Sequence, residues 1–297
     1  TGATGFLGRS LMTQDHAADR VGCGRQAACD FGERYIQVDL NDPRALSSAF
    51  DAVRPDWVVH AAALTDVDRC ETEREEARRI NLEMVANVVE ACTAVEAGLV
   101  HLSTDYVFDG HHGPYSESDP TNPLSHYGRI KLESERLVLS SEVPSIVLRT
   151  LWLYGYIPHA RPNLVTWPLT ALRNGHELKI VDDQRGNPTL VDDLASAILD
   201  LCRQDRRGLF HMGGATYLTR FELVLELARF FGLREELVLP ISTEEAAQRA
   251  PRPLQSGLNT DLVTAVLGRP PVGFLEGIEQ MADRGDFQRD FPTSRSV

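Results

Sequence analysis

The chain begins with Thr1-Gly2-Ala3-Thr4-Gly5-Phe6-Leu7-Gly8, a stretch that spaces three glycines as Gly-x-x-Gly-x-x-Gly. This is a variant of the dinucleotide-binding turn, with one more residue between the first two glycines. Such a turn needs a tight bend, a backbone that can approach a pyrophosphate, and a helix N-terminus aimed at it. The apolar pair Phe6-Leu7 can anchor that helix against a core. A flexible glycine-rich loop is the alternative interpretation.

The pattern after this stretch alternates between strand-like and helix-like segments. The strand candidates of the first half are residues 20–23, 35–38, 57–61, 99–103 and 145–149. The later ones are mostly apolar, as expected of strands that are covered on both faces. Between them, an apolar stripe at helical spacing runs through residues 82–92. Strands that alternate with helices pair in parallel, so the sequence predicts an α/β fold with a Rossmann-like doubly wound parallel sheet.

One element of this predicted fold is missing from the sequence. A Rossmann-like sheet has a strand directly before the glycine turn, and the chain starts at Thr1 without one. We expect that an N-terminal strand has been omitted rather than that the site is damaged, because the remaining fold presupposes a central first strand.

The rhythm of the sequence changes after about residue 150. An irregular stretch with three prolines spans residues 158–168, and strand candidates return at residues 179–181 and 209–212. We expect residues 1–150 to form a dinucleotide-binding Rossmann domain. Residues 151–297 are expected to form a smaller C-terminal α/β substrate-binding lobe, partly interleaved with the sheet.

Composition excludes several classes of function. The 297-residue chain has a net charge of −13 and no basic patch, so nucleic acid is not an expected partner. No apolar run approaches the roughly 20 residues of a membrane span, and no signal peptide is recognised. The five cysteines are scattered, which predicts reduced thiols in a cytoplasmic protein. No His, Cys and carboxylate cluster has metal-ligand spacing, so no metal is expected.

The most informative chemical signal lies in Ser125-His126-Tyr127-Gly128-Arg129-Ile130-Lys131. Tyr127 and Lys131 are four residues apart, so on a helix their side chains leave the same face. An ammonium beside a phenol favours the phenolate and is expected to lower the pKa of the tyrosine. Such a phenol can donate a proton to a carbonyl oxygen near neutral pH. The pair alone is more typical of a half-exposed aromatic beside a solvated cation.

Two residues near the predicted second and third strands bear on the choice of cofactor. Arg25 follows the segment Gly22-Cys23-Gly24, where a carboxylate would accept the ribose hydroxyls of NAD and an arginine suits the extra phosphate of NADP. Arg25 therefore favours NADPH, with NADH as the alternative. A solvated surface arginine is the other interpretation. Asp39 is a candidate to cap the adenine amino group, or else an ordinary loop carboxylate.

Six motifs occur in order along nearly the whole chain. They are Thr1-Gly2-x-x-Gly5-x-x-Gly8, Asp39-Leu40, Ala61-Ala62-Ala63, Asn81, Ser103-Thr104-Asp105 and Tyr127-x-x-x-Lys131. Together they resemble the extended short-chain dehydrogenases/reductases. Longer strings at residues 60–68, 103–110, 149–155 and 183–189, with Arg252-Pro253, resemble the dTDP-4-dehydrorhamnose reductases within that class.

The resemblance implies a hydride-transfer site. Tyr127 would be the general acid that protonates the C4 keto oxygen of a nucleotide-linked 4-keto-6-deoxysugar. Lys131 would hold the nicotinamide ribose and lower the pKa of Tyr127. Thr104 would hydrogen-bond the same carbonyl, and Asn81 would support Lys131 through a water. The small side chains of Ala61-Ala62-Ala63 would let the cofactor lie against the strand ends.

The resemblance also implies a substrate site. The residues that would face the sugar are Thr65, Val67, Asp68, Thr104, Asp105 and Trp152. Arg252 would bind the substrate diphosphate, since a guanidinium fork suits phosphate oxygens. Asn187-Pro188-Thr189 departs from the commoner Ser-Pro-Thr, which puts substrate detail in doubt. The expected reaction is reduction of dTDP-4-dehydrorhamnose to dTDP-rhamnose, and a homodimer is left open.

Three alternatives belong to the same class of folds. A 4,6-dehydratase would need a glutamate after Thr104-Asp105, where this chain has Tyr106. A nucleotide-sugar 4-epimerase that recycles NAD is disfavoured by Arg25 but not excluded. A non-catalytic NADP-binding regulatory subunit, resembling the β-subunit of methionine adenosyltransferase, could keep Thr104, Tyr127 and Lys131. These residues therefore do not separate a reductase from a binding subunit.

Overall fold

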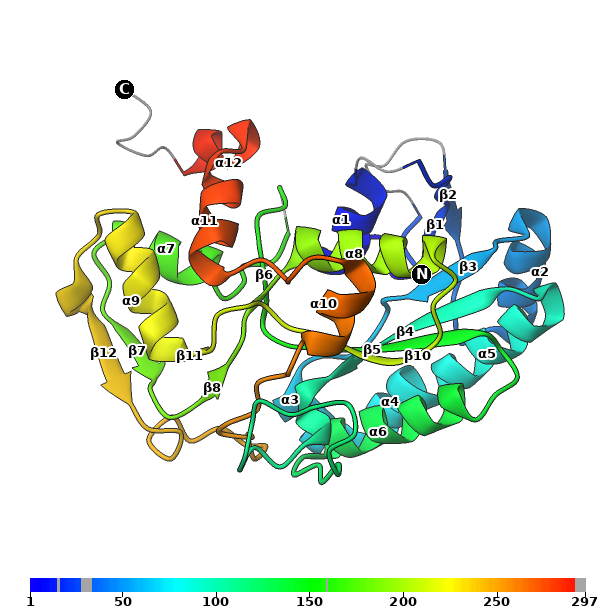
Figure 1. Ribbon diagram of the computed structural model, residues 1–297, viewed down its shortest axis with the longest axis horizontal. Helices are drawn as coiled ribbons and strands as arrows, with labels where there is room; N and C mark the ends of the chain where they lie inside the picture. Colours follow the sequence, from blue (N-terminus) through cyan, green and yellow to red (C-terminus); the bar gives the residue numbers. More distant parts are fainter. Residues whose placement is uncertain (15–16, 28–33, 159, 292–297) are drawn as a thin grey trace.

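The computed structural model describes residues 1–14, 17–27, 34–158 and 160–291 (Figure 1). Its centre is a parallel sheet in the order β10-β5-β4-β3. The strands are β3 (Trp57–His60), β4 (Gly98–Thr104), β5 (Ser145–Thr150) and β10 (Gly208–Met212). The predicted α/β class and the parallel pairing are therefore confirmed.

A second parallel pair continues this layer. It consists of β1 (Gly22–Gly24) and β2 (Tyr35–Gln37). The first residues of the chain connect the two sheets, because Ala3 N donates to Cys23 O (3.3 Å) and Ala61 N donates to Thr1 O (3.3 Å). The Thr1 amino group also donates to Val59 O (2.6 Å). The glycine turn is thus held between β1 and β3.

Helices cover both faces of the sheet (Figure 1). On one face lie α1 (Phe6–Thr13) and α8 (Val191–Arg203), and on the other lie α2 (Pro43–Val53), α5 (Met84–Val95) and α6 (His126–Leu139). Alternation along β5 explains this arrangement. Ile146 and Leu148 pack in the core of α1 and α8, whereas Val147 packs in the core of α2 and α5. This is the doubly wound arrangement expected from the sequence.

The segment between β3 and α5 is less regular than the apolar stripe suggests. It contains α3 (Val67–Thr72), α4 (Arg74–Arg78) and the π-helix η1 (Arg79–Glu83), which runs directly into α5. The 3₁₀ turn η2 (Asp105–Val107) follows β4. Both irregular pieces lie next to α6, and each carries a residue of the predicted site.

The chain after residue 150 builds a second core and also returns to the central sheet. Its elements are β6 (Leu153–Tyr154), α7 (Thr166–Arg173), β7 (Leu178–Val181), β8 (Arg185–Gly186), β9 (Thr189–Leu190), β11 (Leu218–Thr219), α9 (Arg220–Phe230), η3 (Glu235–Leu237), β12 (Val238–Ile241), α10 (Asp261–Leu267), α11 (Phe274–Ala282) and α12 (Gly285–Asp290). β7 and β12 pair in parallel beside α9, and α11 packs on the same core. By contrast, α8 and β10 belong to the central layer. A division at residue 150 stays a prediction.

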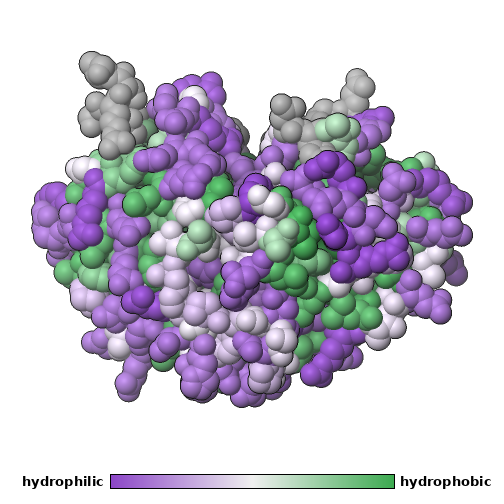
Figure 2. All heavy atoms as spheres, in the orientation of Figure 1, coloured by the Kyte–Doolittle hydropathy of each residue, from purple (hydrophilic) through white to green (hydrophobic). Residues whose placement is uncertain are grey.

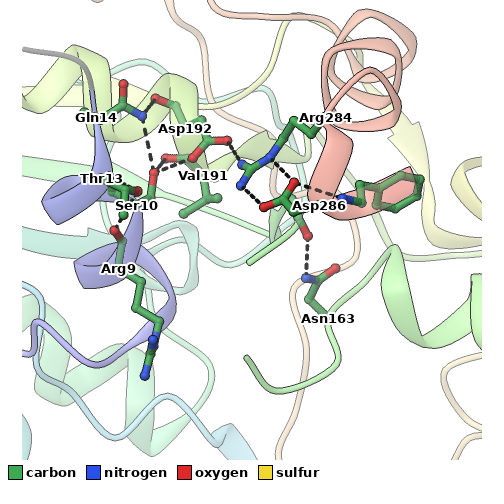
Figure 3. Close-up of polar contacts among 11 residues, drawn as sticks. Arg9, Ser10, Thr13, Gln14, Asn163, Val191, Asp192, Arg284 and Asp286 are labelled. Carbon is green, nitrogen blue, oxygen red and sulfur yellow. Dashed lines mark hydrogen bonds and ion pairs between the residues drawn. The ribbon is translucent and has the colours of Figure 1, made fainter. Parts of the chain in front are cut away.

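One carboxylate ties helix α1 to the end of the chain (Figure 3). Asp192, in the first turn of α8, accepts from Ser10 Oγ at 2.5 Å and from Arg284 Nη1 at 3.0 Å. Gln14 Nε2 donates to the Asp192 carbonyl (3.1 Å), and Asp286 fixes the Arg284 guanidinium with two further hydrogen bonds (3.1 and 2.9 Å). The two carboxylate oxygens of Asp192 therefore accept from different parts of the chain, Oδ1 from helix α1 and Oδ2 from the segment between α11 and α12.

The surface is mixed in character. Figure 2 shows polar residues over most of the face in view, interrupted by smaller apolar areas. Within the described part of the chain, no helix is long and apolar enough to cross a membrane. The described cysteines, Cys23, Cys70, Cys92 and Cys202, are free thiols, as expected. Cys29 lies outside the described residues.

A buried ion pair fastens α6 to the sheet. Arg149 on β5 donates to both carboxylate oxygens of Glu135 on α6, at 2.9 and 2.8 Å, and both residues are at most 3% exposed. Ser103 Oγ on β4 also donates to Glu135. Three neighbouring elements are thus connected through one buried carboxylate.

We predict that Arg149→Met lowers the free energy of unfolding by about 3–5 kcal/mol, because it leaves the Glu135 carboxylate charged and buried without a partner. Combining Arg149→Met with Glu135→Met is expected to restore more than half of this loss, since an apolar pair needs no desolvation of charge. Urea unfolding of the single and double variants measures both values. A double variant less stable than Arg149→Met would contradict this account.

Candidate active site

The glycine turn has the geometry of an anion cradle. Gly2 has φ +69°, and a Cβ at this position would lie 2.7 Å from the Ala62 amide nitrogen. A Cβ on Gly8 would lie 2.1 Å from the Gly2 carbonyl oxygen, so helix α1 packs directly on the turn. The helix begins after Gly5, and no side-chain cap among the described residues uses its first amide groups. These open N–H groups can bind a phosphate.

The other predicted cofactor residues lie around this turn. Ala61-Ala62-Ala63 follows the end of β3, with Ala62 against Gly2. Arg25 is exposed directly after β1. Leu40 is buried and its carbonyl accepts from Asn87 (3.0 Å). The predicted roles of these residues remain predictions, but the small side chains and the open helix end fit a dinucleotide.

Asp39 and Arg25 lie close enough to interact electrostatically. The pKa of Asp39 is lowered chiefly by hydrogen bonds from Asn41, whose backbone and side-chain nitrogens lie 3.0 and 2.9 Å from Asp39 Oδ1. The positive charge of Arg25 lowers it further. The Asp39 carboxylate is therefore ionised; it is also exposed, and its contact with an adenine stays a prediction.

Tyr127 and Thr104 are brought together by close packing of α6 on the turn after β4. Ser125 Oγ caps α6 by accepting from Gly128 N (3.1 Å). A Cβ on Gly128 would lie 2.1 Å from the Tyr106 carbonyl oxygen, so only glycine permits this contact. Tyr127 therefore lies in the buried region where β4 ends, with its ring edge-on to Tyr106 (5.7 Å between centroids).

The expected effect of Lys131 on Tyr127 is wrong for this structure. Burial raises the pKa of Tyr127 well above its ordinary value, and the Asp105 carboxyl adds to the rise. A hydrogen bond with Thr104 opposes it only in part. The ammonium of Lys131 instead lies 3.2 Å from His101 Nε2 on β4. Burial also lowers the pKa of Lys131 to about 8.

Asn81 makes contacts that the sequence did not indicate. From the π-helix η1, its Nδ2 donates to the Leu64 carbonyl (2.9 Å) and its Oδ1 accepts from the Leu64 amide (2.8 Å). The carboxamide thereby fixes the backbone that follows β3 and carries Thr65. Its described hydrogen-bond partner is Leu64, and the expected contact with Lys131 through a water stays a prediction.

The predicted substrate residues fall into two groups. In the first, Asp68 forms an ion pair with Arg252 (3.0 Å), and the Arg252 guanidinium lies 6.0 Å from the centre of the Tyr106 ring. Val67 packs against the apolar cluster that contains Tyr127. Thr65 lies nearby in the chain and is exposed.

The second group is built around Asp105 and Trp152. Asp105 is 1% exposed and accepts from Ser256 Oγ (2.5 Å) and Thr104 Oγ1 (3.0 Å). Burial raises its pKa to about 6. The Arg220 guanidinium lies over the Trp152 ring, 4.4 Å from its centre. Trp152 itself has φ +45°, a strained conformation for a residue with a side chain.

Sequence reasoning missed Arg220, Ser256 and His101. Arg220 begins α9 and acts electrostatically on Tyr106 and Asp105, and burial lowers its pKa. Ser256 lies 151 positions from Asp105 in the chain. Arg220 stands only within a helix-capping signature and Ser256 within no motif, so no sequence signal connected either residue with the site. In the described part of the chain, no group of three His, Cys, Asp or Glu side chains could hold a metal ion.

The fold and the arrangement of these residues define an extended short-chain dehydrogenase/reductase, a class of NAD(P)-dependent oxidoreductases. The family model described as the RmlD substrate binding domain matches residues 1–287. The chain belongs to this family, as the resemblance of its motifs indicated.

Individual relatives divide between dTDP-4-dehydrorhamnose reductases and subunits of methionine adenosyltransferase 2. A dTDP-4-dehydrorhamnose reductase from Aggregatibacter actinomycetemcomitans is 33% identical over 285 residues, covering 91% of this chain and 93% of that protein. The β subunit of methionine adenosyltransferase 2 from Danio rerio is 32% identical over 269 residues, covering 87% and 81%. The crystal structure of dTDP-4-dehydrorhamnose reductase from Bacillus anthracis in complex with NADP has a TM-score of 0.82 at 28% identity, covering 94% and 96%.

The raised pKa of Asp105 predicts a pH-dependent stability. Because the folded state binds this proton more tightly than the unfolded state, the contribution is full below pH 3.8 and is lost as the pH rises through about 6. Wild type is expected to lose about 2 kcal/mol of this contribution between pH 4.5 and 7.5, since one pKa unit corresponds to about 1.4 kcal/mol. Asp105→Asn cannot ionise, so its free energy of unfolding should rise by that amount relative to wild type over the same range.

Urea unfolding of both proteins at the two pH values measures this difference. Asp205→Asn, at an exposed carboxylate paired with Arg207, is the matched control and is expected to show almost none. Equal pH dependence of wild type and Asp105→Asn would show that Asp105 titrates like an ordinary surface carboxylate.

Proposed function

We propose that this protein is an NADPH-dependent reductase of a nucleotide-linked 4-keto-6-deoxysugar, most specifically of dTDP-4-dehydrorhamnose to dTDP-rhamnose. The proposal is carried by one observation: Tyr127 and Thr104 lie together in a buried region at the strand end next to the glycine turn. Relatives with this named activity support it. When bound, NADPH would supply the hydride that reduces C4.

The protonation states of the site suit reduction. Because the pKa of Tyr127 is raised, its hydroxyl carries a proton at neutral pH and can donate it to the C4 oxygen as negative charge develops there. Thr104 Oγ1, which donates to Asp105 Oδ1 at 3.0 Å, would turn to the same oxygen. Lys131 would hold the nicotinamide ribose while its ammonium is charged, below about pH 8.

Two arginines provide a site for the substrate diphosphate. Arg252 and Arg220 repel one another electrostatically and face Tyr106 from the C-terminal half of the chain. Asp68 Oδ1 pairs with Arg252 (3.0 Å) and also accepts from Ala250 N (2.8 Å), whereas Arg220 has no carboxylate partner among the ion pairs of the described residues. A diphosphate would satisfy both guanidinium groups. Trp152, held beneath Arg220, would then face the sugar ring.

A regulatory role is the second candidate. The similarity to the β subunit of methionine adenosyltransferase 2 is close in identity to that with the reductases. A nucleotide-sugar 4-epimerase is a further alternative on the same fold. NADPH absorbance measured with and without dTDP-4-dehydrorhamnose separates these functions: a reductase consumes NADPH only with the sugar. NADPH binding without turnover of any nucleotide-linked 4-keto sugar would overturn the reductase proposal.

Tyr127→Phe removes the proposed proton donor without changing the ring. We expect turnover to fall by roughly 10²-fold or more, while the affinity for NADPH changes little. Steady-state kinetics and a fluorescence titration with NADPH measure the two quantities separately. Unchanged turnover would mean that another group protonates the sugar.

Arg25→Ala tests the choice of cofactor. Because only NADPH carries the extra phosphate, the variant is expected to lose roughly tenfold or more in affinity for NADPH and almost none for NADH. Arg207→Ala is the control, because Arg207 is exposed and directly precedes β10, the edge strand on the far side of the sheet from β3. It should change the affinity for neither cofactor. Equal losses for both cofactors would rule out a contact between Arg25 and that phosphate.

A further inference from the structure

Lys131 has a histidine as its polar partner. Its Nζ lies 3.2 Å from His101 Nε2, and both side chains are buried between α6 and β4. We infer that His101 is a positioning residue that accepts a hydrogen bond from the Lys131 ammonium and aims it at the cofactor ribose. The inference rests on the proposed function, because it assumes that Lys131 holds NADPH.

His101 can act as an acceptor because burial keeps it neutral. Its pKa is lowered well below the ordinary value by burial, by the charge of Lys131 and by the neighbouring His60. An ammonium can only donate, so a charged Lys131 requires a lone pair on Nε2 and places the ring proton on Nδ1. Among the described residues, that Nδ1 has no hydrogen-bond partner. An unpaired buried N–H is costly. The hydrogen bond from Lys131 to Nε2 explains why a histidine nevertheless occupies this position.

The surroundings of the His101 ring leave its Nε2 lone pair to Lys131. Ser134 Oγ donates its only proton to the Lys131 carbonyl oxygen (2.8 Å), so it packs beside Nε2 at 2.9 Å without donating to it. His60, at the end of β3, stacks on His101 with 6.0 Å between ring centres and an angle of 13°. Burial lowers the pKa of His60 to about 3, so this neighbour is also neutral.

The side-chain acceptor beside Lys131 comes from the central strand β4. Asn81 uses its oxygen and one N–H on the backbone of Leu64, which leaves one lone pair and one N–H of its carboxamide for other partners. In the described structure the acceptor beside Lys131 Nζ is the imidazole of His101.

The charge of Lys131 depends on the groups that face it. Glu135 on α6 favours the ammonium, but Arg149 on β5 neutralises that carboxylate through two hydrogen bonds. His60 and His101 are neutral rings, and Tyr127 on the same helix is protonated at neutral pH. Burial therefore prevails, and NADPH affinity is expected to fall as the pH rises through about 8.

The test compares two amide substitutions of His101 that differ in length. The amide of His101→Gln reaches the place of Nε2, whereas the amide of His101→Asn reaches only that of Nδ1. For His101→Asn we expect roughly tenfold weaker NADPH binding at pH 7.5, with the alkaline fall in affinity moved about one pH unit lower, as for loss of one hydrogen bond to a charged group. His101→Gln should recover most of the affinity and of the profile.

A double-mutant cycle separates positioning from simple packing. If His101 acts through Lys131, the effect of His101→Asn on NADPH affinity disappears in a Lys131→Met background. An effect that persists there, a glutamine variant as impaired as the asparagine variant, or an unshifted pH profile would each overturn the inference. Should His101→Asn fail to fold, His101→Met, which is similar in size and has no strong acceptor, takes its place and must shift the profile in the same direction.

The readout distinguishes this inference from the proposed function. Fluorescence titration with NADPH needs no sugar, so the His101 variants can be measured even if no sugar is reduced. Wild-type protein that binds NADPH with the expected pH dependence but turns over no 4-keto sugar would overturn only the reductase. Normal turnover with a pH profile indifferent to His101 would overturn only the inference.

Discussion

The buried ion pair between Arg149 and Glu135 is the constraint on which the rest of the site depends. It joins β5 to the middle of α6, one turn beyond Lys131, while Ser103 ties the same carboxylate to β4. The Phe108 ring packs against the Arg149 guanidinium at 4.9 Å and excludes water from it. Such a pair adds little net stability, but its three hydrogen bonds hold α6 against β4 and β5, the elements that carry the predicted reacting groups.

Burial then decides the charge of each reacting group. It favours the neutral form of an acid and of a base alike, so the pKa of Tyr127 and Asp105 rises while that of Lys131 falls. The shared cause is burial, which penalises the charged form of each of these groups. A site of this kind can respond strongly to the charges that a cofactor and a substrate bring with them.

The fold was predictable because its signals are local. Alternating apolar residues along β5 fill two cores, and the spacing of Gly2, Gly5 and Gly8 suits a turn that leaves no room for side chains. The polar network was not predictable, because Ser256 and Arg220 meet the site only after the chain has folded. The pKa of Tyr127 was predicted with the wrong sign for the same reason. A four-residue spacing reveals a neighbouring lysine, but burial depends on the tertiary structure.

Asp192 is a common anchor for the first helix and the C-terminal segment. One of its oxygens holds Ser10 on the helix behind the glycine turn, and the other holds Arg284 near the end of the chain. The helix whose first turn faces the predicted phosphate site and the segment around Arg284 are therefore fastened to the same side chain. Loss of this one carboxylate would release both of them from helix α8.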